Sequence, residues 1–240
     1  MRLLRCSSPE QFHAHSARLF RARIEANPNL VLAPPAGRTP KGMYRLLAEG
    51  ARARPLDCSR ITLFAIDEIV FRGPGGFRFR QDIDEDFLAW ARVPDERCHF
   101  FDVGAPDLEA ICAAHDAAIL AAGGLDLIMM GLGENAHIAS NEPGSPFDSR
   151  TRPVTLTERT LRQFFPDSMP LPPRPWRAVS LGIATILAAR SIVVQAAGAH
   201  KRRAVRALLE APVSERFPCT ALRTHQDLTV IVDAEAYPED

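Results

Sequence analysis

Five short apolar runs, separated by stretches with helical spacing, set the strongest limit on how this chain of 240 residues can fold. The runs lie at 30–33, 61–70, 125–130, 191–197 and 228–232. Continuous apolar runs of this length are typical of strands that are covered on both faces. Their alternation with helical patterns predicts an α/β fold, a mainly parallel, doubly wound sheet with helices on both faces.

Polar residues mark where the intervening helices begin. Ser8 with Gln11 forms a capping box at the start of the first helix. Thr39 is expected to cap a second helix, which ends before Gly50. Asp107 is expected to cap a third, and a fourth helical pattern covers residues 201–210.

Charge and cysteine content exclude several classes of protein. The formal net charge is zero, so no overall field favours nucleic acid or an acidic membrane as a partner. No apolar run approaches the length of a membrane span, and the N-terminus lacks the apolar core of a signal peptide. The five cysteines are an odd number without CxxC spacing, which argues against a disulfide framework or a zinc site. We therefore expect one cytoplasmic domain over residues 1–240, and the sequence leaves open whether it forms a homo-oligomer.

The residues that follow the first apolar run suit an anion site. In open α/β sheets, ligands bind beyond the carboxyl ends of the strands. The turn of Ala36, Gly37, Arg38 and Thr39 leads directly into a helix, whose first backbone N–H groups attract anions. A plain capped turn is the alternative interpretation.

Two adjacent acids, Asp67 and Glu68, interrupt the second run. Burying a carboxylate is costly without a partner. The pair is either a general acid/base at the end of a strand or a structural salt bridge or helix cap.

The densest polar segment, residues 131–143, follows the third run. It combines glycines with His137, whose imidazole titrates near neutral pH, and with Glu142, which can orient it. After the fourth run, Lys201 at a helix start can bind a phosphate as a point charge. Together these segments predict a phosphate-binding site with acid/base residues.

Several segments, in order and spacing, resemble the glucosamine-6-phosphate deaminase/isomerase family, which is related to the 6-phosphogluconolactonases. They are LVLAPPAGRTPKGMYRLL, TLFAIDEIVF, DLIMMGLGENAHIASNEP, SRTRPVTLTERT and VVQAAGAHKRRAV. The resemblance extends from about Leu30 to Asp233. Its most specific part is Asn141-Glu142-Pro143, the ending of this loop in deaminases.

The resemblance implies a role for each matching residue. Asp67 matches the carboxylate that moves a proton between C1 and C2, His137 the histidine that assists ring opening, and Glu142 the acid that supports it. The segment 166–175 falls near the family's mobile lid. No metal or cofactor is implied, and the reaction, classed with hydrolases, releases ammonia. The residues matched to phosphate binding are Ala36, Gly37, Arg38, Thr39, Arg162 and Lys201.

The sequence departs from the family at Asn135-Ala136-His137, where the family has Asp-Gly-His. An amide cannot hold the charge of the aspartate, which the family counts among its catalytic acids. Three hypotheses follow: a deaminase/isomerase, a related enzyme of altered specificity such as a lactonase-type hydrolase or another phosphosugar isomerase, and a non-catalytic sugar-phosphate-binding paralogue.

Overall fold

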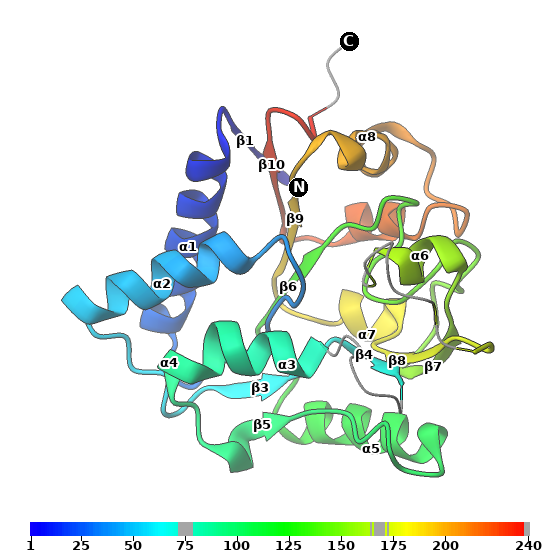
Figure 1. Ribbon diagram of the computed structural model, residues 1–240, viewed down its shortest axis with the longest axis horizontal. Coiled ribbons are helices and arrows are strands. Elements are labelled where there is room, and N and C mark those ends of the chain that lie inside the picture. Colours follow the sequence, from blue (N-terminus) through cyan, green and yellow to red (C-terminus); the bar gives the residue numbers. More distant parts are fainter. Residues whose placement is uncertain (72–78, 164, 166–170, 172, 238–240) are drawn as a thin grey trace.

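A seven-stranded, all-parallel sheet forms the centre of the computed structural model, which describes residues 1–71, 79–163, 165, 171 and 173–237. Every strand pair in this sheet is parallel, in the order β1-β10-β9-β6-β2-β3-β5. The predicted doubly wound, parallel α/β fold is therefore confirmed (Figure 1). The strands of this sheet are β1 (Arg2–Cys6), β2 (Val31–Ala33), β3 (Thr62–Phe64), β5 (Cys98–His99), β6 (Leu127–Gly131), β9 (Ile192–Ala196) and β10 (Leu228–Asp233).

Helices cover both faces of the sheet because side chains alternate in direction along each strand. On β6, Ile128 and Met130 pack into one core, and Leu127 and Met129 pack into the other. The first core is shared with α5, α7 and α8, and the second with α1, α2 and η1. The helices are α1 (Pro9–Ala26), α2 (Lys41–Ala53), α3 (Phe79–Ile83), α4 (Ala89–Ala91), α5 (Leu108–Ala121), α6 (Glu158–Arg162), α7 (Ile183–Leu187) and α8 (Arg202–Glu210), with short π or 3₁₀ turns η1 (Asp84–Leu88), η2 (Asp95–Arg97), η3 (Ala199–Lys201) and η4 (Pro218–Thr224).

A second, antiparallel sheet has the order β4-β8-β7 and lies to one side of the main sheet (Figure 1). It consists of β4 (Asp67–Val70), β7 (Arg152–Thr155) and β8 (Arg177–Ser180). The prediction of one strand over 61–70 is therefore wrong: the chain leaves the main sheet after Phe64 and begins β4 at Asp67. The two residues between the strands, Ala65 and Ile66, are apolar and buried, so the apolar run continues across the break.

Two of the three predicted helix caps are present. The Ser8 hydroxyl accepts a hydrogen bond from the backbone N–H of Gln11 at 3.3 Å, and the Asp107 carboxylate accepts one from Ala110 at 3.0 Å. The prediction for Thr39 is wrong, because α2 begins after Pro40 without a side-chain cap and continues past Gly50 to Ala53.

Two segments of unusual composition are only partly described: residues 72–80, rich in glycine and arginine, and residues 166–175, with five prolines. Of residues 72–80, Phe79 and Arg80 begin α3, and the rest lie outside the described residues. Most of the segment 166–175, which resembles the family's lid, also lies outside them. Within the described ranges, no helix is both long enough and apolar enough to cross a bilayer.

Candidate active site

A cavity of about 1100 Å³ opens at the carboxyl ends of four adjacent strands, β9, β6, β2 and β3. The turns after these strands supply most of its walls, as the position of the polar segments predicted. The structure brings all the predicted site residues to this cavity except Asn135 and Glu142, which lie behind His137. The predicted residues that line it are Ala36, Gly37, Arg38, Thr39, Asp67, His137, Arg162 and Lys201.

Asp67 lies at the inner end of this cavity, where the chain passes from the main sheet to β4. The Ser140 hydroxyl donates a hydrogen bond of 2.7 Å to Asp67 Oδ2. Burial raises the pKa of Asp67 to about 7, against the opposing effect of this hydrogen bond, and the charge of Glu68 adds to the rise. A carboxyl group that titrates near neutral pH can both accept and return a proton.

Glu68 has a structural role, which separates the two interpretations of the acidic pair. Its carboxylate accepts hydrogen bonds from the backbone N–H groups of Phe79 at 3.0 Å and Arg80 at 2.9 Å, at the start of α3. Glu68 is only 4% exposed and does not line the cavity. Asp67 is therefore the candidate acid/base, and Glu68 is the helix cap.

A chain of hydrogen bonds connects His137 to Glu142 through Asn135. Asn135 Oδ1 lies 2.7 Å from His137 Nδ1, and Asn135 Nδ2 lies 2.7 Å from Glu142 Oε2. The other carboxylate oxygen of Glu142 accepts a bond of 3.0 Å from the backbone N–H of Thr157. Because the Asn135 amide group donates to a carboxylate, its oxygen faces the imidazole and must accept the Nδ1–H. His137 Nε2 is then left without a proton and can act as a base.

The charge states along this chain follow from burial. Burial lowers the pKa of His137, against the opposing effect of Glu142, so the imidazole is neutral at pH 7. Burial also acts to raise the pKa of Glu142, but hydrogen bonds from Thr160 and Thr157 outweigh it, and the net pKa is lowered. Asn135 therefore transmits no proton but holds a neutral histidine in one tautomer beside an ionised carboxylate.

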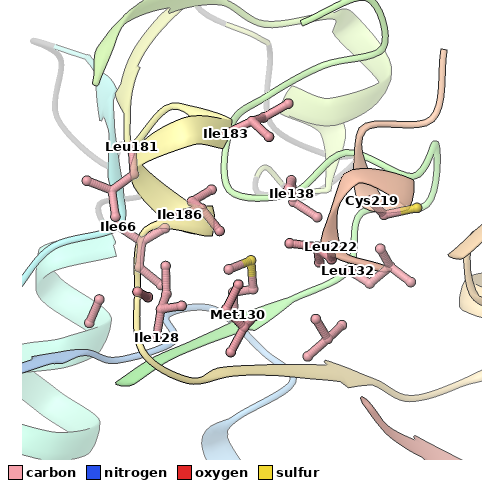
Figure 2. Close-up of a cluster of buried hydrophobic side chains, with 14 of the residues drawn as sticks. Ile66, Ile128, Met130, Leu132, Ile138, Leu181, Ile183, Ile186, Cys219 and Leu222 are labelled. Carbon is pink, nitrogen blue, oxygen red and sulfur yellow. The ribbon is translucent and has the colours of Figure 1, made fainter. Parts of the chain in front are cut away.

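The loop around His137 has strict steric requirements. A Cβ atom on Gly133 would lie 2.3 Å from the His137 ring, so only glycine fits there. Ala136 has a φ of 71°, a left-handed conformation that disfavours a side chain. Its carbonyl accepts a hydrogen bond of 3.0 Å from Cys219. Figure 2 shows Leu132 and Ile138, on either side of His137, packed with Cys219 in one apolar core, which holds the loop in place.

The turn after β2 forms another part of the cavity wall. Gly37 has a φ of 91°, and its N–H donates a 2.8 Å hydrogen bond to the Asp82 carboxylate, so this N–H is engaged within the protein. Arg38 Nη2 donates a bond of 3.1 Å to the carbonyl of Gln163, just after α6. Thr39, which does not cap α2, lines the cavity instead.

Further cations line the cavity with Arg38, and we call the part that they line its basic end. Burial lowers the pKa of Lys201 to about 8. The charge of Glu134 opposes this decrease, and the charge of Arg38 adds to it. Arg162 lines the cavity from the last residue of α6. The sequence did not single out Arg159, which also lines the cavity and lies 3.7 Å from Glu134. Together these side chains can bind a phosphate group.

Comparison with known proteins identifies the family of this fold and site. The pattern of the glucosamine-6-phosphate isomerases/6-phosphogluconolactonase family matches residues 8–231. The chain belongs to this family. Glucosamine-6-phosphate deaminase 1 of Bacillus subtilis is 36% identical to it over 245 residues, and glucosamine-6-phosphate deaminase of Bacillus velezensis is 34% identical over 242 residues. Each alignment covers 98% of both chains.

Solved structures of family members place the fold in the same group. A structure described as a monomeric glucosamine-6-phosphate deaminase superposes with a TM-score of 0.90 at 34% identity and covers 98% of both chains. The 6-phosphogluconolactonase from Trypanosoma cruzi superposes with a TM-score of 0.78 at 22% identity, which supports the fold alone. The predicted relationship to both branches of the glucosamine-6-phosphate isomerase/6-phosphogluconolactonase family is thus confirmed.

Proposed function

We propose that this protein is a glucosamine-6-phosphate deaminase, which converts an amino-sugar 6-phosphate to a ketose phosphate and releases ammonia. One observation carries the proposal: a single cavity is lined both by Asp67 and His137 and by three cations, Arg38, Arg162 and Lys201. Relatives with this name, at 34–36% identity over almost the whole chain, support it.

The first step is opening of the sugar ring, which moves the proton of the C1 hydroxyl to the ring oxygen as the C1–O bond breaks. His137 suits this step because its Nε2 has a free lone pair and its Nδ1–H is fixed by Asn135. Glu142 is the acceptor behind Asn135, so it favours the transient positive charge on the imidazole. We assign Asn135 and Glu142 to positioning His137.

The second step moves a proton from C2 to C1 and a proton from the C2 amino group to O1, which converts the open aldose to a ketose-type imine at C2. A single base must face both carbons, and it must give up the proton that it takes. The pKa of Asp67, about 7, suits both halves of this transfer. Water then adds to the C2 imine and ammonia leaves, so the net reaction consumes one water and forms one ketose phosphate and one ammonia.

The basic end of the cavity fixes the other end of the substrate. Arg38, Arg162 and Lys201 offer the charge that a phosphate dianion needs. Their interactions are the same in the substrate and in the transition state, so they contribute to binding and orientation more than to the rate of the chemical step.

A direct assay tests the proposal. The purified, folded protein is incubated with glucosamine 6-phosphate, and ammonia and ketose phosphate are measured together. We expect equal amounts of both products, and no formation of either would refute the proposed function. Titration of acid released from 6-phosphogluconolactone is the matched test of the lactonase alternative, and we expect no rate above the uncatalysed one because the loop ends in Asn141-Glu142-Pro143.

A further inference from the structure

Glu134 places a negative charge at the basic end of the cavity. It follows Gly133 in the loop after β6 and lines the cavity with Arg159 of α6. Its Oε2 lies 3.7 Å from a guanidinium nitrogen of Arg159. Both side chains keep access to solvent, with exposed fractions of 25% and 58%. The contact is therefore a loose ion pair inside a ligand cavity.

The same carboxylate shares the cavity with Lys201 and interacts with it electrostatically. Positive charge on Arg38, His137 or His200 disfavours the charged form of Lys201. The negative charge of Glu134 favours it. The Lys201 ammonium makes no hydrogen bond with any residue in the described ranges. A half-buried ammonium that lines the cavity without a direct partner among the described residues suits an anionic ligand.

We propose that Glu134 is a specificity-determining residue: its carboxylate is a built-in counter-anion of Arg159 and Lys201 that weakens ligand binding in proportion to the negative charge the ligand brings to this end of the cavity. The inference rests on the proposed function in one respect, that the phosphate of the substrate binds here. It does not depend on whether ammonia is released.

The physical basis is the Coulomb interaction between two anions that share the same cations. Its energy is proportional to the ligand's charge at a given separation. A phosphate monoester is close to a dianion at pH 7, since its second pKa is about 6. A sulfate ester carries a single charge, and an unsubstituted sugar carries none at this position. Removing Glu134 should therefore raise the affinity for the three ligands unequally. The increases in the logarithm of the affinity should be in the ratio of about two to one to zero for the phosphate, the sulfate and the unsubstituted sugar.

The experiment compares dissociation constants at pH 7.0 by calorimetry for glucosamine 6-phosphate, glucosamine 6-sulfate and glucosamine. For Glu134→Gln we expect tighter binding by about tenfold for the phosphate and about threefold for the sulfate, with no change for glucosamine. Glu158→Gln is the matched control. Glu158 begins the same helix, α6, and pairs with an arginine, Arg174, but it does not line the cavity, so its loss should change none of the three values.

A second readout is the pH dependence of phosphate binding, with inorganic phosphate as the probe. Affinity requires the charged form of Lys201, so in the wild-type protein it should decline as the pH rises through about 8. Glu134 helps to retain that proton against Arg38, His137 and His200, so in Glu134→Gln the decline should begin at lower pH. A structural role of Glu134 would leave this midpoint unchanged.

Three results would overturn the inference: equal changes for all three ligands, weaker phosphate binding at pH 7.0, or an unmoved pH midpoint. If Glu134→Gln does not fold, Glu134→Ser removes the same charge and takes its place. Failure of the proposed function has a different signature, because a protein that binds sugar phosphates with the graded response but releases no ammonia would contradict only the deaminase activity.

Discussion

Two groups of residues line the cavity: the acid/base residues, here called its reaction end, and the cations, here called its phosphate end. They differ in how completely the protein itself provides their polar partners. At the reaction end, Asp67 bonds to Ser140, and His137 is linked through Asn135 to Glu142. At the phosphate end, Lys201 has no hydrogen bond to any described residue, and Arg159 pairs with Glu134 only at 3.7 Å. The protein thus orders its proton-transfer groups in advance, whereas Lys201 and Arg159 keep the capacity to bind a ligand.

This difference separates two kinds of mutational effect. A group that acts on the reacting atoms should change kcat, because its interaction is made in the transition state. A group that binds the same phosphate throughout the reaction should change KM. Substitutions at the two ends test whether the cavity is divided in this way.

The largest effect is expected for Asp67→Asn. An amide of similar shape can still accept the hydrogen bond of Ser140 but cannot take up a proton. We expect kcat to fall by about 10²–10⁴-fold, with KM for glucosamine 6-phosphate changed by less than about threefold. Steady-state kinetics of ammonia release measure both values, and a proportional rise in KM would instead place Asp67 in substrate binding.

The same variant should be more stable than the wild type above neutral pH. The pKa of Asp67 is raised from its ordinary value of 3.8 to about 7 on folding, so its stabilising contribution is complete below about 4 and is lost as the pH rises through 7. At pH 8 we expect Asp67→Asn to raise the free energy of unfolding by roughly 1–4 kcal/mol, with a smaller gain at pH 5. Urea denaturation at the two pH values would reveal it.

The second largest effect is expected for Lys201→Met at the phosphate end. Loss of a charge-assisted contact with phosphate should raise KM by about 10- to 100-fold and change kcat much less. In the wild type we expect KM to rise above about pH 8 as Lys201 loses its proton. In the variant this rise should be absent. Arg203→Met, at an exposed position of α8, the helix that follows Lys201, is the control, and a comparable loss there would point to net charge instead of a contact.

A smaller effect, at the reaction end, is expected for Asn135→Asp. The new carboxylate would lie where Asn135 now donates a bond of 2.7 Å to Glu142, so two acids would adjoin and the pKa of His137 would rise. We expect kcat/KM to fall by about three- to tenfold at pH 6, where the imidazole would be charged, and little at pH 8. A large gain in activity at neutral pH would contradict this and show that the site lacks an acid in the natural chain.

The five buried strands were readable in the sequence because burial on both faces leaves a continuous apolar run. β1 was missed because it is an edge strand with Arg2 and Arg5 among its five residues, and its burial is partial. The break between β3 and β4 was missed because the two residues between them, Ala65 and Ile66, are apolar and buried and so continue the run. Whether a strand lies at the edge of a sheet, or where it ends, depends on contacts with other segments that form only on folding.

The candidate site was predictable where its residues follow strands, as Asp67, His137 and Lys201 do. Arg159 was missed because it lies among charged residues that resemble an exposed helical face, with nothing local to mark it. The bridging position of Asn135 was also hidden, since a substitution in sequence shows the lost charge but not the two hydrogen bonds that remain. The local sequence shows where the turns lie, but only the fold decides which side chains pair across two turns.

The smallest effect is expected for Ala136→Gly, which tests whether the order at the reaction end carries a backbone cost. Ala136 is 2% exposed and has a φ of 71°, where an L side chain costs roughly 1–2 kcal/mol. Glycine removes this cost but loses more chain entropy on folding, by roughly 0.5–1 kcal/mol, and gives up one buried methyl. We expect a net gain in the free energy of unfolding of about 0.5 kcal/mol with unchanged kcat, measured by urea denaturation and ammonia release. A loss of more than about 1 kcal/mol would contradict this expectation. It would show that packing of the methyl group in the core beside Cys219 stabilises the His137 loop by more than the left-handed backbone of Ala136 destabilises it.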